Sequence, residues 1–531
     1  MKRFLLAVVL LAVSFAASAQ MNISGTLRDT EGNGIAGVTV SDGFSCVVTD
    51  TNGRYKMTTS SDAVHVFYSI PSAYKVNVKD GHPDFYQTLE KGVKKYDFTL
   101  TPNQTDEKAF RLIMVADPQA QCEFHVKRFE RETMPDIRQY VDAQTLPCYG
   151  VTLGDIVYTE GEHNCNKYLV PMRNAMHYDN GHLLFFQTIG NHDFNDHPVK
   201  LDKGTSTYNL AYQRAFEGVF GPVNYSWNRG DVHIVSMKDY IADDNPNKFR
   251  YHKEYGNPCF TDEQLEWLRQ DLALVPNDKL IIFCVHIPML NQSAVSAVTA
   301  LLQQFPNCHI MSGHTHYMRN EPTRTPGIYE HVHAAVSGQW WWSNINGDGV
   351  PNGYGVYEID GNKIVNGYYK GINKGMNDRD YQIRLYRGNL KAGTEQRSFN
   401  LMHGNNVIIA NVFNASPKWK VEIFADGVSE GEMTFIKEKK YQYHNSYNDQ
   451  SEFSQDIPED SCQDWWAIGY HIGVIKRESS GYYVNNFHMY KHTLQNKDAT
   501  EIRVEATDEF GRKYVQTKIT GDYDYSEIDY N

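Results

Sequence analysis

The chain has 531 residues, of which 41% are hydrophobic, and a formal net charge of −13. Domains usually hold about 100–200 residues, so this length predicts about three of them. The densest basic run is KEKK at 437–440, so the chain lacks the basic face of a nucleic-acid binder, and no nucleic-acid polymer is expected as a partner. The sequence indicates no protein partner.

Residues 1–19 predict a secretory signal peptide. Lys2 and Arg3 precede a short apolar run, and Ala-Ser-Ala stands just before Gln20. This pattern predicts cleavage after Ala19 and a periplasmic or secreted protein. Neither this run nor a later one is long enough to predict a transmembrane helix. The eight cysteines include no Cys-x-x-Cys pair, so most are expected to be buried free thiols, with one or two disulfides left open.

Residues 21–102 predict an N-terminal β-sandwich. Apolar and polar residues alternate between glycine-rich turns, and Asn52-Gly53 is a turn signal. The pattern GVTVSDG followed by VTDTNGRY resembles the carboxypeptidase-regulatory-like and related immunoglobulin-like modules that precede bacterial envelope enzymes.

Residues 108–375 predict an α/β domain, because apolar strand-like runs alternate there with helical patterns. The clearest helix is expected over 261–273, where Thr261 and Gln264 form a potential capping box. Residues 385–525 return to aromatic-rich strand patterns and predict a C-terminal β-rich domain, with 387–397 as a linker.

Polar side chains follow the ends of five predicted strands. In chain order they are Asp117 and Gln119, Asp155 of Gly-Asp, the Asn191-His192-Asp193 run of Gly-Asn-His-Asp, His286, and His314 and His316 of Gly-His-Thr-His. One such motif alone is more often a turn or a cap, but five in this order favour a shared site, because ligand sites gather at strand ends in layered α/β folds. Their oxygens and imidazole nitrogens are suitable ligands for divalent metals.

This motif order resembles the calcineurin-like metallophosphoesterase superfamily, whose pattern is Asp-x-His, Gly-Asp, Gly-Asn-His-Asp/Glu, a lone His and Gly-His-x-His. The resemblance implies a central four-layer αββα sandwich, flanked here by the immunoglobulin-like β-sandwich and the C-terminal β-rich domain. It also implies two divalent ions. Metal one would take Asp117, Gln119, Asp155 and His316, and metal two would take Asp155, Asn191, His286 and His314, with Asp155 bridging both.

The resemblance implies hydrolysis of a phosphomonoester or phosphodiester, either a small molecule or an envelope component. A metal-bridging hydroxide would attack phosphorus in line, and Asn191 would also contact a phosphoryl oxygen. His192 would protonate the leaving oxygen as general acid, and Asp193 would orient His192.

Gln119 departs from the family pattern, which usually has histidine there. An amide oxygen is harder than imidazole, so it shifts preference towards Mn²⁺, Mg²⁺ or Ca²⁺ and away from Zn²⁺. The candidate ions are Mn²⁺, Mg²⁺, Ca²⁺, Fe²⁺ and Zn²⁺, with Mn²⁺ favoured. Gln119 also supports an alternative, an envelope binding or structural protein with a weakened metal site. Retention of His192 argues against that alternative, because folding does not need it.

Three consecutive tryptophans follow the last metal motif. Side chains alternate along a strand, so Trp341 is expected in the core, with Trp340 and Trp342 either at a domain interface or, with Tyr354, lining the substrate cleft. The loop 344–353 is rich in Gly, Asn and Asp and is expected to be a mobile lid or a turn.

Overall fold

The structure is a computed structural model that describes residues 20–159, 166–194, 206–242, 259–290, 295–401, 403–436, 443–445, 462–476 and 484–528. The predicted signal peptide lies outside the described residues. Within these ranges, no helix is long and apolar enough to cross a membrane. Cys46, Cys122, Cys148, Cys284 and Cys308 are free thiols, as expected for most of the cysteines.

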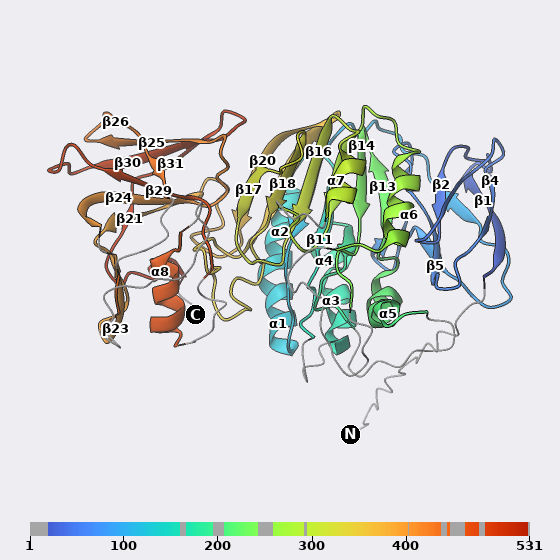
Figure 1. The fold of residues 1–531 in the computed structure, drawn as a ribbon, viewed down its shortest axis with the longest axis horizontal. Coiled ribbons are helices and arrows are strands. Elements are labelled where there is room, and N and C mark those ends of the chain that lie inside the picture. The colour runs from blue at the N-terminus through green and yellow to red at the C-terminus, as the bar shows by residue number, and fades with distance from the viewer. Residues whose placement is uncertain are drawn as a thin grey trace, which may run out of the picture.

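The N-terminal strands form two facing sheets at one end of the molecule (Figure 1). In sheet order, one holds β4 (Arg54–Thr58), β1 (Asn22–Asp29) and β9 (Phe98–Leu100), and the other holds β3 (Cys46–Val48), β2 (Thr39–Ser41), β5 (His65–Tyr68) and β8 (Tyr86–Thr88); β6 (Val78–Lys79) pairs with β7 (His82–Pro83). Buried and exposed residues alternate along β4, as a strand with one solvated face requires. The predicted β-sandwich is therefore confirmed.

Two further sheets form the centre of the molecule. The first runs β12 (Phe185–Thr188), β11 (Cys148–Leu153), β10 (Ala109–Val115), β19 (Gly353–Asp360) and β20 (Lys363–Gly371). The second runs β13 (Tyr225–Arg229), β14 (Val232–Ser236), β15 (Leu280–Cys284), β16 (Asn307–Ser312), β18 (Ile328–Val332) and β17 (Arg319–Pro322). β10, β11 and β12 are parallel, and so are β14, β15, β16 and β18, so within each set the carboxyl ends of the strands share one edge.

Helices cover the outer faces of both sheets (Figure 1). They are α1 (Glu123–Arg128), a π-helical turn at Phe129–Thr133, α2 (Met134–Asp142), a 3₁₀ turn at Asn166–Tyr168, α3 (Leu169–Ala175), α4 (Tyr178–Gly181), α5 (Tyr208–Phe220), α6 (Asp262–Leu272) and α7 (Ser296–Leu302). Along β10, Leu112 and Met114 pack in one core cluster with the second sheet, whereas Ile113 and Val115 pack with the helices. This alternation produces the four-layer αββα sandwich that the motifs predicted, and α6 begins with the expected capping box of Thr261 and Gln264.

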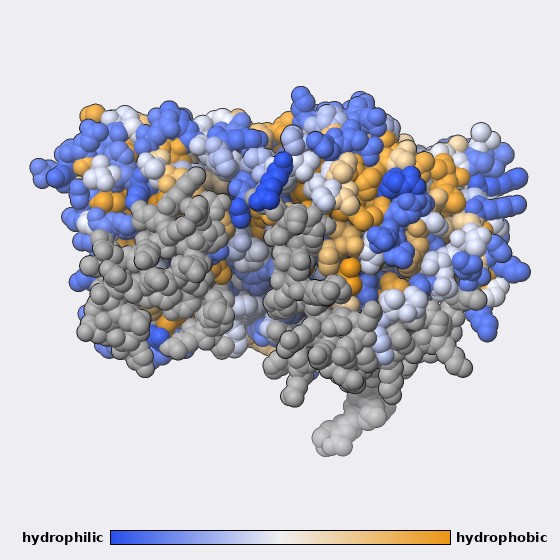
Figure 2. Space-filling view, viewed as in Figure 1, coloured by the Kyte–Doolittle hydropathy of each residue, from blue (hydrophilic) through white to orange (hydrophobic). Residues whose placement is uncertain are grey.

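The N-terminal sandwich and the central domain share one apolar core, because the cluster that contains Leu27 and Val40 continues through Trp227 to Trp267. Trp267 Nε1 also donates a hydrogen bond to Ser41 Oγ at 2.9 Å. On the face seen in Figure 2, hydrophilic residues cover both ends of the molecule and hydrophobic residues gather around α6 and α7.

The described residues of the C-terminal region form three sheets and one short helix. In sheet order they are β27 (Thr434–Phe435), β29 (Met489–Thr493), β24 (Gly404–Val412), β21 (Ile383–Gly388) and β32 (Ile519–Thr520); β22 (Lys391–Thr394), β23 (Arg397–Leu401) and β28 (Tyr443–Asn445); and β26 (Val428–Glu432), β25 (Lys420–Ala425), β30 (Ile502–Thr507) and β31 (Lys513–Gln516). α8 (Trp465–Ile468) continues into a π-helical turn at Gly469–Val474, and a 3₁₀ turn follows at Ser526–Ile528.

The prediction of a linker at 387–397 is wrong. β21 ends within this stretch, and β22 and β23 form an antiparallel hairpin there. The hairpin turns at Glu395 and Gln396, and Gly393, which pairs with Ser398 inside the hairpin, has φ +89°. Glycine-rich polar sequence is common to linkers and to tight turns, so composition alone did not separate them.

Candidate metal centre

The predicted ligands lie in loops at the carboxyl ends of the parallel strands. Asp117 and Gln119 follow β10, Asp155 follows β11, and Asn191 follows β12 in the first sheet. His286 follows β15, and His314 and His316 follow β16 in the second sheet. The structure thus brings five loops from two sheets together at one place.

Five of these side chains stand on backbone in the left-handed region. The φ angles are +50° for Asp117, +41° for Gln119, +50° for Asp155, +67° for His314 and +56° for His316. Twelve described non-glycine residues have positive φ, so the predicted ligands are strongly represented. Such a conformation costs about 1–3 kcal/mol per residue and gathers at functional sites. Sharp turns of this kind reverse the chain after each strand.

Glycines allow the loops to approach one another closely. Gly154 has φ +86°, and a Cβ placed there would lie 2.6 Å from His286 Nδ1. A Cβ on Gly313 would lie 2.5 Å from Asp117 Oδ2. The glycines of the Gly-Asp and Gly-His-Thr-His motifs are therefore required by the packing of the site.

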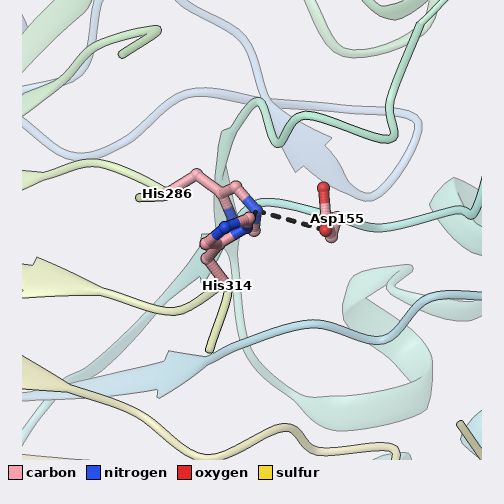
Figure 3. Close-up of side chains that lie close together, drawn as sticks. All are labelled: Asp155, His286 and His314. Atoms are coloured by element: carbon pink, nitrogen blue, oxygen red, sulfur yellow. Dashed lines mark hydrogen bonds and ion pairs between the residues drawn. The ribbon is translucent and has the colours of Figure 1, made fainter. Parts of the chain in front are cut away.

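Asp155, His286 and His314 form the tightest cluster, and one ligand atom of each lies within 4.8 Å of the other two (Figure 3). His286 Nε2 lies 3.1 Å from Asp155 Oδ2 and 3.2 Å from His314 Nδ1. It also lies 2.8 Å from Asn191 Oδ1.

The hydrogen bonding of His286 makes this cluster suitable for a cation. His286 Nδ1–H donates to the carbonyl oxygen of Leu153 at 2.8 Å, so Nε2 is the lone-pair atom of the neutral ring. Nε2 then faces a carboxylate oxygen, an amide oxygen and a second imidazole nitrogen. These acceptors repel one another unless a proton or a metal ion lies among them. The arrangement fits a divalent cation.

Asp117, Gln119 and His316 lie beside this cluster. His314 N–H donates to both oxygens of Asp117, at 3.1 and 2.9 Å, and His316 Nε2 lies 3.4 Å from Asp117 Oδ1. Gln119 Nε2 donates to Asp155 Oδ2 at 2.9 Å. Among the residues that the structure describes, Gln119 Oε1 and His316 Nδ1 are buried without a hydrogen-bond partner. Buried acceptor atoms without a hydrogen-bond partner are suitable ligands for a metal ion.

The charges of the cluster shift its pKa values. Burial alone would raise the pKa of Asp155, but the positive charges of His286 and His192 outweigh it and lower that pKa below its usual range. Burial opposes a charge on His286, yet the Asp155 carboxylate raises the pKa of His286 to about 10. Burial and the charge of His286 lower the pKa of His314 to about 3. The cluster therefore holds an ionised carboxylate beside a positive charge.

His192 lies at the edge of the cluster, with Nε2 4.0 Å from Asp155 Oδ2. Its Nδ1–H donates to the carbonyl oxygen of Thr159 at 3.1 Å, and its ring stacks on Tyr158 with centroids 4.4 Å apart. Its own N–H donates to Asp155 Oδ1 at 2.8 Å. These contacts fix the ring and direct Nε2 towards the site.

The prediction that Asp193 orients His192 is wrong. The two carboxylate oxygens of Asp193 accept hydrogen bonds from Val157 N at 2.9 Å and Gly190 N at 2.8 Å, so they join two loops instead of contacting the imidazole. Burial and the charge of Asp155 raise the pKa of Asp193 to about 7. Thr159 takes the orienting role through its main chain, which leaves no side-chain signal in the sequence.

The three consecutive tryptophans lie in three different environments. The Trp340 ring lies 5.4 Å from the ring of His316, beside the site. Trp342 is 39% exposed and lies 6.0 Å from the His125 ring of α1. Trp341 is fully buried, as expected.

The placement of Tyr354 in the cleft is wrong. Its side chain is 1% exposed, and its hydroxyl donates to Asp136 on α2 at 2.8 Å. Tyr354 lies on β19, inside the first sheet, and its side chain points into the layer between that sheet and the helices, where it packs in their core cluster.

The loop 344–353 is also buried throughout, which contradicts a mobile lid and fits the alternative of a turn, since Gly349 N–H donates to Asn346 O at 3.0 Å. Asn346 Nδ2 donates to Ala335 O, and Asp348 Oδ1 accepts from Val350 N. Polar residues in this loop bond inward because the C-terminal region covers it.

Sequence reasoning missed Asp239, which follows β14 behind the cluster. Its buried Oδ2 accepts a hydrogen bond from Ile287 N at 2.6 Å, next to His286. Burial raises the pKa of this carboxyl to about 7. The run VHIVSMKD, in which an aspartate follows an apolar strand, carried the same signal as the recognised ligands.

Three family models match the chain along its length. The calcineurin-like phosphoesterase model matches residues 111–318, its N-terminal companion matches 21–103, and its C-terminal companion matches 330–514. The chain belongs to the calcineurin-like phosphoesterases. Divalent metals are the cofactors of this family.

Solved structures with a similar fold include a 5′-nucleotidase precursor from Thermus thermophilus, at 12% identity and a TM-score of 0.29, over 49% of this chain and 54% of that one. Sulfate thiohydrolase SoxB from Thermus thermophilus is also 12% identical, with a TM-score of 0.29, over 50% and 56%. A predicted phosphoesterase from Streptococcus pneumoniae is 10% identical, with a TM-score of 0.22, over 50% and 95%. The chain thus spans about half the length of the first two, and the family assignment rests on the family models. No curated protein matches the sequence.

Proposed function

We propose that this calcineurin-like phosphoesterase is exported and hydrolyses a small or envelope phosphomonoester or phosphodiester at a centre of two divalent ions. The observation that carries the proposal is the convergence of a carboxylate oxygen, an amide oxygen and a nitrogen of a second imidazole on His286 Nε2. Such a donor set suits a divalent cation.

Metal one would be held by Asp117, Gln119, Asp155 and His316, and metal two by Asp155, Asn191, His286 and His314. When bound, two such ions supply an activated nucleophile and positive charge for the phosphoryl oxygens. The hard amide oxygen of Gln119 favours Mn²⁺ over Zn²⁺ at metal one.

The residues of the chain itself supply orientation and a proton. His192 is anchored through Nδ1–H, so its Nε2 faces the site and, in the imidazolium form, donates a proton to the leaving oxygen. Asn191 is positioned beside His286 to contact a phosphoryl oxygen as well as a metal ion. Trp340, next to His316, and the half-exposed Trp342 offer apolar surfaces to the organic part of a substrate.

The test is hydrolysis of p-nitrophenyl phosphate and bis-p-nitrophenyl phosphate by metal-stripped protein with Mn²⁺, Mg²⁺, Ca²⁺, Zn²⁺ or Fe²⁺ added back. Asp155→Ala and His192→Ala are assayed beside His182→Ala, whose imidazole instead contacts Asp142 at 2.6 Å. We expect metal-dependent turnover that is lost in Asp155→Ala, reduced in His192→Ala and retained in His182→Ala.

The substrate that is turned over faster distinguishes monoester from diester chemistry. Turnover that survives Asp155→Ala would contradict the proposed centre. Export is tested separately by N-terminal sequencing of the protein isolated from its native cells, and we expect the mature chain to begin at Gln20.

A further inference from the structure

The stretch around the three tryptophans at 340–342 makes hydrogen bonds to the loop that carries Asp117 and Gln119. Three successive carbonyl oxygens of that loop each accept a hydrogen bond from it. Val336 N–H donates to Ala116 O at 2.8 Å, and Ser337 Oγ donates to Asp117 O at 2.9 Å. Trp341 Nε1–H donates to Pro118 O at 2.6 Å. We call residues 336–350 the bracing loop.

The ligand loop needs such support because its backbone is strained. Asp117 and Gln119 both have positive φ, a conformation that persists only when the surroundings hold it. Trp341 and Ser337 are fully buried, so their hydrogen bonds do not compete with water. Arg128 donates to the carbonyl oxygen of Trp341 and fixes the tryptophan in turn.

The far end of the bracing loop holds the second motif that contributes to metal one. Asp348 Oδ2 accepts a hydrogen bond from Met318 N at 2.8 Å, two residues beyond His316. Together with the contact between Trp340 and His316, this links the bracing loop to each ligand proposed for metal one alone.

The C-terminal region in turn holds Asp348. His488 Nε2 lies 3.1 Å from Asp348 Oδ2. The carbonyl oxygen of Asp348 accepts hydrogen bonds from Asn411 Nδ2 at 2.7 Å and Asn486 Nδ2 at 2.8 Å. Arg384 donates to Gly349 O at 2.6 Å. The four side chains are at most 1% exposed, so the contacts form a buried polar network between the C-terminal sheets and the loop.

We propose that the C-terminal region acts as a brace, that is, it stabilises the positions of the ligands of metal one. Ser337, Trp341 and Asp348 are positioning residues that connect this region to Asp117, Gln119 and His316. This inference rests on the proposed two-metal centre. The ligands of metal two are held differently, since His286 is anchored to Leu153 O within the central sheets. Loss of the brace should therefore weaken metal one and spare metal two.

The test is calorimetric titration of metal-stripped full-length protein with Mn²⁺ alone. Trp341→Phe removes the Nε1 donor and keeps an apolar ring, Ser337→Ala is a smaller change, and Asp348→Asn removes the charge. Trp267→Phe is the matched control for the first, because Trp267 is equally buried and donates to Ser41 far from the site. Asp271→Asn, from the buried pair of Asp271 and His233, is the control for Asp348→Asn.

Wild-type protein should bind two Mn²⁺. In Trp341→Phe, Ser337→Ala and Asp348→Asn, we expect one equivalent to bind about tenfold more weakly, which corresponds to about 1.4 kcal/mol, while the other is unchanged. Both controls should bind as wild type. Thermal unfolding of the metal-free proteins checks that Trp341→Phe and Trp267→Phe are folded to a similar extent.

Two results would overturn the brace: unchanged binding of both ions in all three loop variants, or equal weakening of both ions. If wild type binds two Mn²⁺ and turns over substrate while the loop variants bind as wild type, the brace fails and the proposed function stands. Fewer than two Mn²⁺ on wild type would overturn the two-metal proposal and the brace with it.

Discussion

Lys238 is a fully buried lysine whose ionisation should govern how stability changes with pH. It lines a cavity of about 370 Å³ between the N-terminal sandwich and the central domain. Its Nζ donates to Asn209 O at 3.0 Å, Asn209 Oδ1 at 2.8 Å and Gln213 Oε1 at 2.9 Å. Burial lowers the pKa of Lys238 to about 7, against 10.5 for an ordinary lysine. The perturbation is Lys238→Met, which removes the titrating group.

The sign follows from proton binding in the two states. Between about pH 7 and pH 10.5 the unfolded chain holds a proton on Lys238 that the folded protein has lost, so stability rises with pH across this window. Below about pH 7 both states are protonated, and the cost of burying the charge is fully present. From about pH 6 to about pH 9, wild type should gain about 2.5 kcal/mol relative to Lys238→Met.

The assay is urea unfolding of both proteins at these two pH values, followed by tryptophan fluorescence. Lys95→Met is the control, because the Lys95 side chain is 70% exposed and should show no such change. A difference between wild type and Lys238→Met that is the same at both pH values would refute the reasoning. It would mean that the three acceptors stabilise the ammonium enough to offset its burial.

Three further predictions concern the centre itself. His192→Ala should lower kcat by about 10²–10⁴ on phosphate esters with basic leaving groups and far less on p-nitrophenyl phosphate, whose acidic leaving group needs no proton; an equal loss on both would exclude a general acid. Gln119→His should shift the metal that supports fastest turnover from Mn²⁺ towards Zn²⁺, and an unchanged metal series would contradict coordination by Gln119. Gly313→Ala should weaken Mn²⁺ binding about tenfold or more, because its Cβ would displace the Asp117 carboxylate. Gly361→Ala, where a Cβ would meet nothing within 4 Å, should bind as wild type, and equal loss in both variants would contradict a local clash with Asp117.

Local sequence patterns predicted much of the fold. Strand alternation indicated the N-terminal sandwich, and Thr261 with Gln264 marked the start of α6, because capping and periodicity act over a few residues. The linker prediction at 387–397 failed since β22 and β23 pair there as a hairpin, and pairing depends on the partner strand and not on the composition of the segment.

The burial of Tyr354 and of the loop 344–353 could not be predicted in the same way. Tyr354 is buried because its strand lies inside a sheet covered by α2. The loop is buried because Asn411, His488 and Arg384 arrive from the distant C-terminal sheets. In both cases the burial depends on long-range contacts, which the polarity of the segment itself does not indicate.

The sequence by itself determined which side chains gather at the site. Their types and order sufficed, because each follows an apolar strand and the carboxyl ends of parallel strands must meet at a common edge. Only the tertiary structure decided what holds them there. Thr159 orients His192 through a carbonyl oxygen, and Trp341 holds Pro118 from more than two hundred residues away. Every residue has a main-chain carbonyl oxygen, so the sequence does not show which of them accepts such a hydrogen bond. These contacts can be recognised only in the folded structure.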